Sequence, residues 1–433
     1  MKATFTKAVR YEITAVCTSP FRTGGASGPD EILIAHNGQY IYQGSSLAGA
    51  LRNWISLNHK GEEEVLFGNK NVEGSLIVSD GVFQPEALPA SRPRVKINAK
   101  TGTQENLFST NYLPVGSTFN FSIVWLGNKE DPTTLTNILE AALSAVNNGD
   151  IRLGGQKTNG FGRVKLTTVK KQNYDMTNET DRDNWLAGKF EGEPVPLTEN
   201  TSAGLVKFTL SGYMESVLVR SDKPDEKDNK TSNITVNMKE NNNSIIPASS
   251  IKGVVRARVS KIAPFAGFKA DVVDSIFGRE SKDNDNGVAG VVWFNDAYLK
   301  EKSRDVARIR INRFTGSVMN VIKNSLFTER PISSDVNIEV VVPENRKDAC
   351  LLILYALRDL GISLYPIGSG SSVGRGYMRG EKLTVDVSGE SKVILTFNKD
   401  ASCDVKDEEH ILDEWKKECF KHIERHIEKE AVS

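Results

Sequence analysis

The sequence lacks the features that would draw it to a charged polymer or a membrane. Its 55 lysine and arginine residues balance 55 aspartate and glutamate residues, so the net charge is zero. A neutral chain has no overall field of one sign, and any nucleic-acid site must be a local patch. No run of about eighteen apolar residues occurs, the length that a membrane helix needs. We therefore expect a soluble, cytoplasmic protein with no membrane partner.

Cysteine is scarce and scattered. The four cysteines form no C-x-x-C pair, whereas disulfide frameworks and zinc ribbons need paired spacings. His422 and His426 have the i, i+4 spacing of two metal ligands, but no third ligand stands at a suitable position. We expect neither a disulfide framework nor a structural zinc site.

One pattern occurs twice, about two hundred residues apart. Residues 43–54 read QGSSLAGALRNW and residues 247–258 read PASSIKGVVRAR. A serine pair just before an apolar-periodic run predicts a helix start, where hydroxyl and N–H groups can receive a phosphate. A capped helix that only packs on a sheet would also explain either copy alone. The serines and arginines of the two copies are Ser45, Ser46 and Arg52, then Ser249, Ser250 and Arg256.

A second repeated block predicts a cationic strand. Residues 94–102 read RVKINAKTG and residues 308–316 read RIRINRFTG. Side chains alternate along a strand, so Arg94 and Lys96 share one face, as do Arg308 and Arg310. Such a face suits an arm that contacts phosphates or bases. It suits equally an edge strand that charge protects against aggregation.

A third repeated block is rich in glycine. Residues 153–166 read LGGQKTNGFGRVKL and residues 367–380 read IGSGSSVGRGYMRG, at a constant separation of 214. Glycines let backbone N–H groups face an anion without obstruction by Cβ atoms, although they also serve ordinary tight turns. The candidate anion-binding residues of these loops are Gly154, Gly155, Lys157, Gly160, Gly368, Ser369, Gly370 and Gly374.

The order of elements then repeats as a whole. Each half reads strand, glycine loop, helix, strand, ribbon, strand, helix, glycine loop and strand, with Asp80 in the first half matched by Asp296 in the second. We predict an α+β fold of two tandem ferredoxin-like domains with hairpin insertions. The predicted parts are a first domain over 1–172, a linker over 173–204, a second domain over 205–389, and a tail over 390–433. The tail should end in a helix whose apolar stripe docks on the body or on a partner.

Together these ordered motifs resemble the RAMP superfamily of CRISPR systems, and specifically the backbone subunits of type III effector complexes, as a tandem, type III-D-like fusion. The resemblance covers residues 8–170 and 205–388. It implies two RNA-recognition-motif-like domains along a guide RNA, each with a thumb hairpin that interrupts the guide–target duplex. The implied RNA contacts are those named above together with Lys252. The implied partners are guide RNA, single-stranded target RNA, other RAMP subunits and a large polymerase-like subunit.

The resemblance also implies a cutting residue. In the family it is an aspartate between the first glycine turn and the Ser-Ser helix, and Asp30 in GGASGPDEILI has that place. Its implied role is to hold a divalent metal, expected to be Mg²⁺, or to help deprotonate a ribose 2′-hydroxyl. A turn or strand cap after Pro29 is the structural alternative. In the second half the place falls near Asn233, an amide unsuited to act as a base. Asp228, in the lengthened loop before it, is the other possible second-half equivalent.

Three other functions stay open at this point. The chain is a non-catalytic guide-RNA scaffold if its acids only serve turns. A metal-independent guide-RNA-processing ribonuclease would use a histidine, and His36 lies in the right loop, although the turn HNGQ explains an exposed histidine on its own. A small-molecule enzyme that binds a metabolite phosphate is the third.

Overall fold

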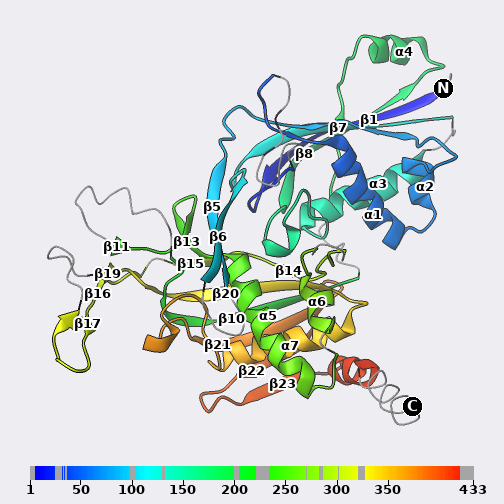
Figure 1. The fold of residues 1–433 in the computed structure, drawn as a ribbon. Helices are drawn as coiled ribbons and strands as arrows, with labels where there is room; N and C mark the ends of the chain where they lie inside the picture. Colours follow the sequence, from blue (N-terminus) through cyan, green and yellow to red (C-terminus); the bar gives the residue numbers. More distant parts are fainter. Residues whose placement is uncertain are drawn as a thin grey trace. The chain divides into compact units, whose positions relative to one another are not determined.

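The chain forms two compact units (Figure 1). The computed structural model describes residues 5–24, 32, 34, 37–97, 104–128, 132–198, 204–220, 234–269, 271–281, 286–300, 302–319 and 327–419. The first unit comprises Met1–Arg92, Phe108–Lys157 and Phe161–Ser202. The second comprises Pro93–Leu107, Thr158–Gly160 and Ala203–Ser433.

The first unit has an antiparallel sheet with strand β1 near its centre. Strand β1 (Lys7–Cys17) pairs with β7 (Thr118–Gly127) on one side and with β8 (Val164–Asp175) on the other. The sheet order is β2-β4-β7-β1-β8-β9, and β3 also pairs with β7. The shorter strands are β2 (Ile41–Tyr42), β3 (Leu76–Val78), β4 (Gly81–Phe83) and β9 (Glu193–Pro194).

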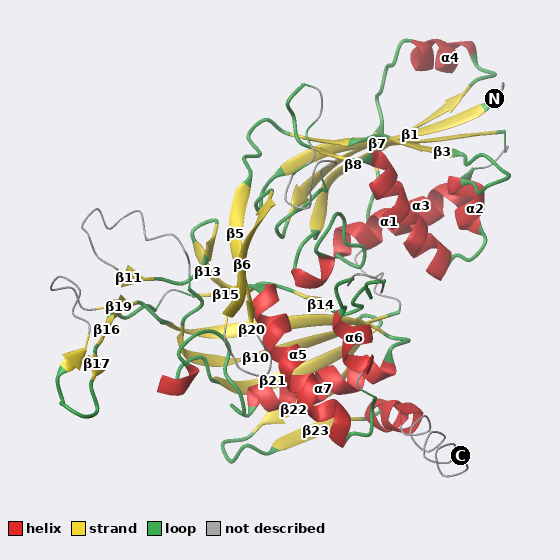
Figure 2. Ribbon diagram, in the orientation of Figure 1, coloured by secondary structure: helices red, strands yellow, loops and turns green. Residues whose placement is uncertain are grey.

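Helices α1 and α3 lie on one face of this sheet (Figure 2). In α1, Leu47, Leu51 and Ile55 recur every four residues and are fully buried, so one stripe of the helix faces the core. Helix α3 ends at Gly149, whose left-handed conformation closes the last turn. The helices of the first unit are α1 (Gly44–Asn58), α2 (Glu62–Phe67), α3 (Thr133–Asn148) and α4 (Glu179–Leu186), with a 3₁₀ turn η1 (Lys157–Asn159).

The second unit repeats this plan around strand β10 (Leu205–Val217). Strand β10 pairs antiparallel with β20 (Ile332–Pro343) and β21 (Met378–Val387), in the sheet order β14-β20-β10-β21-β22-β23. The outer strands are β14 (Trp293–Phe294), β22 (Glu390–Phe397) and β23 (Cys403–Asp407). Its helices are α5 (Ala248–Phe265), α6 (Asp271–Phe277) and α7 (Lys347–Gly361), with a 3₁₀ turn η2 (Ser371–Val373).

Smaller sheets accompany the two main ones. The predicted ribbons are present as the pair β5–β6 and the pair β17–β18. The remaining strands form the orders β11-β19-β16 and β12-β13-β15. Their bounds are β5 (Ala90–Ile97), β6 (Gln104–Tyr112), β11 (Ile234–Thr235), β12 (Lys239–Glu240), β13 (Asn243–Ile246), β15 (Ala297–Leu299), β16 (Val306–Arg308), β17 (Arg310–Ile311), β18 (Val318–Met319) and β19 (Phe327–Glu329).

The structure confirms the predicted mixture of helices and antiparallel strands and adds order where none was expected. The predicted linker contains α4 and β9. The predicted tail contributes β22 and β23 to the second sheet, and residues 411–419 are helical. Trp415 of this helix is 2% exposed and its ring lies 6.3 Å from that of Phe208. The described part of the apolar stripe therefore docks on the body of its own unit.

Candidate nucleic-acid interface

Both Ser-Ser helices begin before their serines. The N-cap residues are Gln43 and Pro247, and the helices start at Gly44 and Ala248. The predicted helix starts are therefore confirmed, but the N-cap position lies two residues before each serine pair. Both pairs lie in the first helical turn, where Ser45 and Ser46 are exposed and Ser249 and Ser250 are half-exposed.

An aspartate from a neighbouring loop caps each helix instead. The Gly44 N–H donates to Asp80 Oδ1 over 2.7 Å, and the Ala248 N–H donates to Asp296 Oδ1 over 2.7 Å. A carboxylate at this end satisfies an otherwise unpaired N–H and complements the positive end of the helix dipole. The phosphate that the sequence predicts here would meet a helix end that already carries one negative charge.

The two glycine loops have the same backbone hydrogen bonds. The Leu153 N–H donates to the Gly162 carbonyl over 2.8 Å, and the Ile367 N–H donates to the Gly376 carbonyl over 2.9 Å. Gly162 and Gly376 have positive φ, and a Cβ atom on either would lie 2.0 Å from the carbonyl oxygen of Leu153 or Ile367. Only glycine fits these two places.

Several N–H groups of the loops are already occupied. The Gly154 N–H donates to the Tyr42 hydroxyl, and the Gly155 N–H donates to the Arg22 carbonyl. In the second loop the Ser369 N–H donates to the Leu218 carbonyl over 2.8 Å. These three groups do not face an anion, because each serves the turn itself. The other predicted loop glycines, all with positive φ, are Gly160, Gly368, Gly370 and Gly374.

The two matched arginines lie in different surroundings. Arg256 donates to the Gly278 carbonyl over 2.8 Å and to Asp274 Oδ1 over 2.7 Å, so it joins α5 to the end of α6. Arg52 is half-exposed, and in the described part of the chain it has no hydrogen bond or ion pair. Of the two guanidinium groups, that of Arg52 is the one whose donors are available to an RNA phosphate.

Two arginines on one face of β5 are buried. Arg94 is only 9% exposed and Arg92, two residues earlier on the same face, is 3% exposed. The expectation of an exposed cationic arm is therefore wrong for Arg94. The guanidinium of Arg92 lies 5.3 Å from the ring of Tyr112 and 5.7 Å from that of Phe161. Aromatic faces attract a cation and make its burial tolerable.

Two predicted lysines are half-buried cations. Within the second unit the Lys252 ammonium donates to Thr158 Oγ1 over 2.9 Å. Burial, together with the smaller effects of the Arg256 and Arg94 charges, lowers the pKa of Lys252 to about 8. Burial also lowers the pKa of Lys157. Both lysines favour an anionic neighbour that would restore their charge.

Some predicted residues lie outside the described residues: Asp30, His36, Asp228, Asn233, His422 and His426. The side chains of Lys96, Arg308 and Arg310 lie outside them as well. Where side chains are described, no three His, Cys, Asp or Glu residues are grouped as a metal site would require. No helix in the same residues is long and apolar enough to cross a membrane.

Sequence reasoning missed an ion-pair cluster beside the second glycine loop. Arg375 pairs with Glu329, and both are almost completely buried. Arg220, which is 58% exposed on its side chain, lies 3.5 Å from the same carboxylate. The signal was available, because Arg375 stands between two glycines where the first loop has Phe161.

Comparison with known proteins assigns the family. The model of the RAMP superfamily matches residues 14–165 and 201–379, which is more than half of the chain. The chain belongs to the RAMP superfamily. The first RAMP region reaches from β1 into β8, and the second reaches from the residues before β10 into β21. Each region therefore contains one capped Ser-Ser helix and one glycine loop.

One solved structure is a more distant match. A chain in the cryo-EM structure of the Type III-B Cmr-beta bound to cognate target RNA is similar at 15% sequence identity, with a TM-score of 0.32. The match covers 38% of the present chain and 61% of that chain, so less than two thirds of the relative is spanned. No curated protein matches the sequence.

Proposed function

We propose that the chain is a guide-RNA-binding backbone subunit of a type III CRISPR effector complex in the cytoplasm. One observation carries the proposal: the RAMP family model matches twice, and the two matches share their local geometry down to single hydrogen bonds. The pair Gly44–Asp80 recurs as Ala248–Asp296. Two equivalent surfaces in one chain suit a single RNA strand that passes over both.

The finer architecture that we propose is a tandem fusion of two ferredoxin-like domains, of the type III-D kind. The central strand orders β8-β1-β7 and β21-β10-β20 support it. In each, the first strand of the unit lies between the strand before a helix and the strand after it, the helix being α3 in the first unit and α7 in the second. The ribbons β5–β6 and β17–β18 are the proposed thumbs. Phe314, at the turn of β17–β18, is 92% exposed and offers a face on which a base can stack.

The proposed RNA contacts are mainly side chains rather than loop N–H groups. Ser45, Ser46 and Arg52 offer hydroxyl and guanidinium donors on one helix, and Lys252 offers an ammonium on its counterpart. Phosphate contacts of this kind position an RNA without reading its sequence. The proposed partners are the guide RNA, a single-stranded target RNA, other RAMP subunits and a large polymerase-like subunit.

We also propose that Asp30 cuts the target RNA with a divalent metal. The support is the order of residues around it, a glycine pair, the acid and an apolar segment before the Ser-Ser helix. Mg²⁺ usually binds one or two carboxylates together with substrate phosphates, so a single aspartate fits a metal that arrives with RNA. When bound, the metal would polarise a phosphate oxygen. Asn233 in the matching place makes the second domain a non-cutting scaffold.

The test uses the assembled complex with labelled target RNA. Asp30→Ala should remove one product band while guide and target binding, measured by gel shift, stay unchanged. Asp228→Ala is the matched control in the second domain and should leave every band in place. An unchanged ladder in Asp30→Ala would instead make the chain a pure scaffold. Processing of a repeat RNA by the isolated protein in EDTA, lost in His36→Ala, would point to guide maturation.

A further inference from the structure

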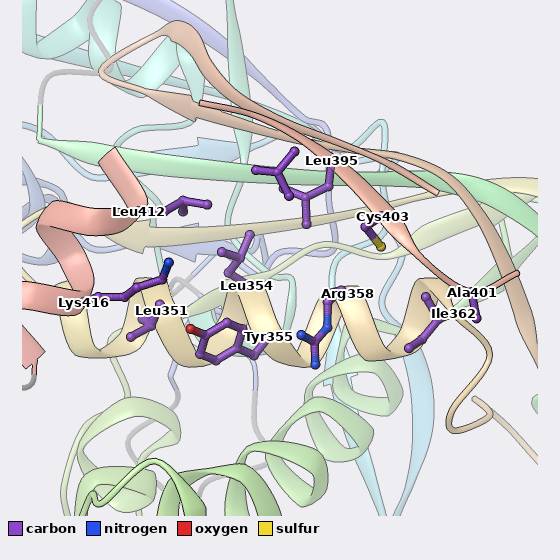
Figure 3. A pocket seen from close by; sticks show the side chains of 11 residues that line it. Leu351, Leu354, Tyr355, Arg358, Ile362, Leu395, Ala401, Cys403, Leu412 and Lys416 are labelled. Carbon is purple, nitrogen blue, oxygen red and sulfur yellow. The ribbon is translucent and has the colours of Figure 1, made fainter. Parts of the chain in front are cut away.

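The second unit contains an apolar cavity that none of the RNA-facing motifs uses (Figure 3). Its volume is about 400 Å³, and it lies between α7, the strands β22 and β23, and the helical residues 411–419. This volume is within the range of cavities that bind specific ligands or anchoring side chains. The apolar side chains that line it are Leu351, Leu354, Ile362, Leu395, Val405 and Leu412.

The cavity carries positive charge at its border. Figure 3 shows Arg358 on α7 and Lys416 on the last described helix among the lining residues. Lys416 is paired with Asp413 over 3.3 Å, so the positive charge to be matched lies at Arg358. Asp359, which is 1% exposed, accepts from Arg358 over 2.5 Å and from Arg258 over 2.6 Å. Two guanidinium groups therefore share one carboxylate, and the group of three keeps one net positive charge. An acidic ligand would be favoured at this border.

A free strand edge adjoins the cavity. Strand β23 is the last strand of its sheet and, within the described residues, pairs only with β22. Cys403 and Val405 line the cavity. Because side chains alternate along a strand, Asp404 and Lys406 face the opposite side of the sheet. Val405 is 53% exposed. An outer strand presents unpaired N–H and C=O groups that can pair with another chain.

The first unit closes the edge of its own sheet with an extended segment. Strand β9 pairs with β8, and the chain then reaches α3, where the Thr198 N–H donates to Ser144 Oγ and Asn148 donates to the Thr198 carbonyl. One extended segment, 193–198, thus pairs with the sheet through β9 and contacts α3 through the backbone of Thr198. The outer edge of β23 has no such segment in the described part of the second unit.

We propose that the cavity and β23 together form a docking site for an extended, acidic segment of a partner protein. The segment adds a strand to β23, places an apolar side chain in the cavity, and brings a carboxylate to Arg358. The mainly aliphatic lining favours a protein side chain over an RNA phosphate. The free backbone edge beside the cavity favours a peptide over a small molecule, which would leave the strand unpaired. The site does not depend on the proposed RNA function.

The test uses the full-length protein and a defined probe, a fluorescein-labelled peptide of seven residues that alternates Asp with Leu. Anisotropy should show binding, and hydrogen exchange should slow at residues 403–407 because their outer N–H groups become paired. Val405→Trp fills the cavity and should weaken binding at least about tenfold, as loss of a central anchor does. Lys406→Trp, the same change on the opposite face of the strand, should leave binding unchanged.

One further variant and one further peptide test the charge and the apolar anchor separately. Arg358→Gln should weaken binding several-fold, with Arg258 still paired to Asp359, and a peptide that alternates Asp with Ser should not bind. The proposal is overturned if the Asp-Leu peptide does not bind, or if it binds Val405→Trp as well as the parent. Saturable binding of decanoate with no peptide-induced slowing at 403–407 would also overturn it, because the cavity would then serve a small apolar anion. Thermal unfolding checks that each variant is folded.

Discussion

The two glycine loops hold the same backbone with different side chains. In the first, Phe161 stands between two glycines, and the guanidinium of Arg92 lies 5.7 Å from its ring. In the second, the same place holds Arg375, which pairs with the buried carboxylate of Glu329. The first loop is anchored by a cation on an aromatic face and the second by an ion pair. The two halves therefore share the backbone turn but differ in the pair of residues that anchors it: Arg92 with Phe161 in the first half, and Arg375 with Glu329 in the second.

The glycines at the loop ends should show the largest effect, and the same effect in both halves. Gly162→Ala and Gly376→Ala each place a Cβ atom 2.0 Å from a carbonyl oxygen at positive φ. Each should lower the free energy of unfolding of its unit by about 3 kcal/mol or more, measured by urea unfolding. Gly49→Ala and Gly253→Ala are matched controls in open helical positions and should stabilise by up to about 1 kcal/mol. Loss in only one half would mean that the loops are not equivalent.

Removal of the anchoring arginine should cost more stability in the second half than in the first. Arg375→Met leaves the Glu329 carboxylate buried without its ion pair to Arg375 and should cost about 3 kcal/mol. Arg92→Met removes a cation from two rings and should cost about 1 to 2 kcal/mol, because Met still packs against them. Adding Glu329→Gln to Arg375→Met should recover part of the loss in a double-mutant cycle. Equal costs for the two single variants would mean that the ion pair and the cation–aromatic contact stabilise their loops equally.

The helix caps should differ by less. Asp296 is half-buried and should contribute about 1 to 2 kcal/mol, while exposed Asp80 should contribute about 0.5 to 1 kcal/mol. Replacement of each by Ala, followed by urea unfolding, measures the difference. High salt should reduce the cost at Asp80 more than at Asp296, since solvent screens an exposed charge more strongly. A larger salt effect at Asp296 than at Asp80 would contradict the greater burial of Asp296.

A pH dependence should appear in the second half alone, because Ala48 stands where Lys252 does. Burial lowers the pKa of Lys252 to about 8 from its ordinary 10.5. Between these values the unfolded chain holds a proton that the folded chain has lost, so stability from this residue rises with pH across that window. Lys252→Met should therefore gain most over the parent near about pH 7 and least near about pH 10. A constant difference across that range would refute the lowered pKa.

Much of the fold could be predicted because its signals are local. The constant separation of 214 residues between glycine loops reflects two turns that need positive φ at matched places, such as Gly162 and Gly376. The helix 133–149 was predictable from periodicity and a terminal glycine, and it ends at Asn148 with Gly149 as its cap. The serine pairs marked both helix starts, but they could not show which group caps each helix, because Asp80 and Asp296 are distant from the helices in the sequence.

By itself, the sequence determined the repeated order of elements, the glycine turns and the membership of a family with two matched regions. Only the tertiary structure decided which polar groups are still available: Asp80 and Asp296 occupy the helix starts, Arg256 is held by Asp274, and Arg94 is buried. The reason is physical. Backbone conformation follows from neighbouring residues, but a side chain's partner and its exposure depend on segments that meet only after the chain has folded.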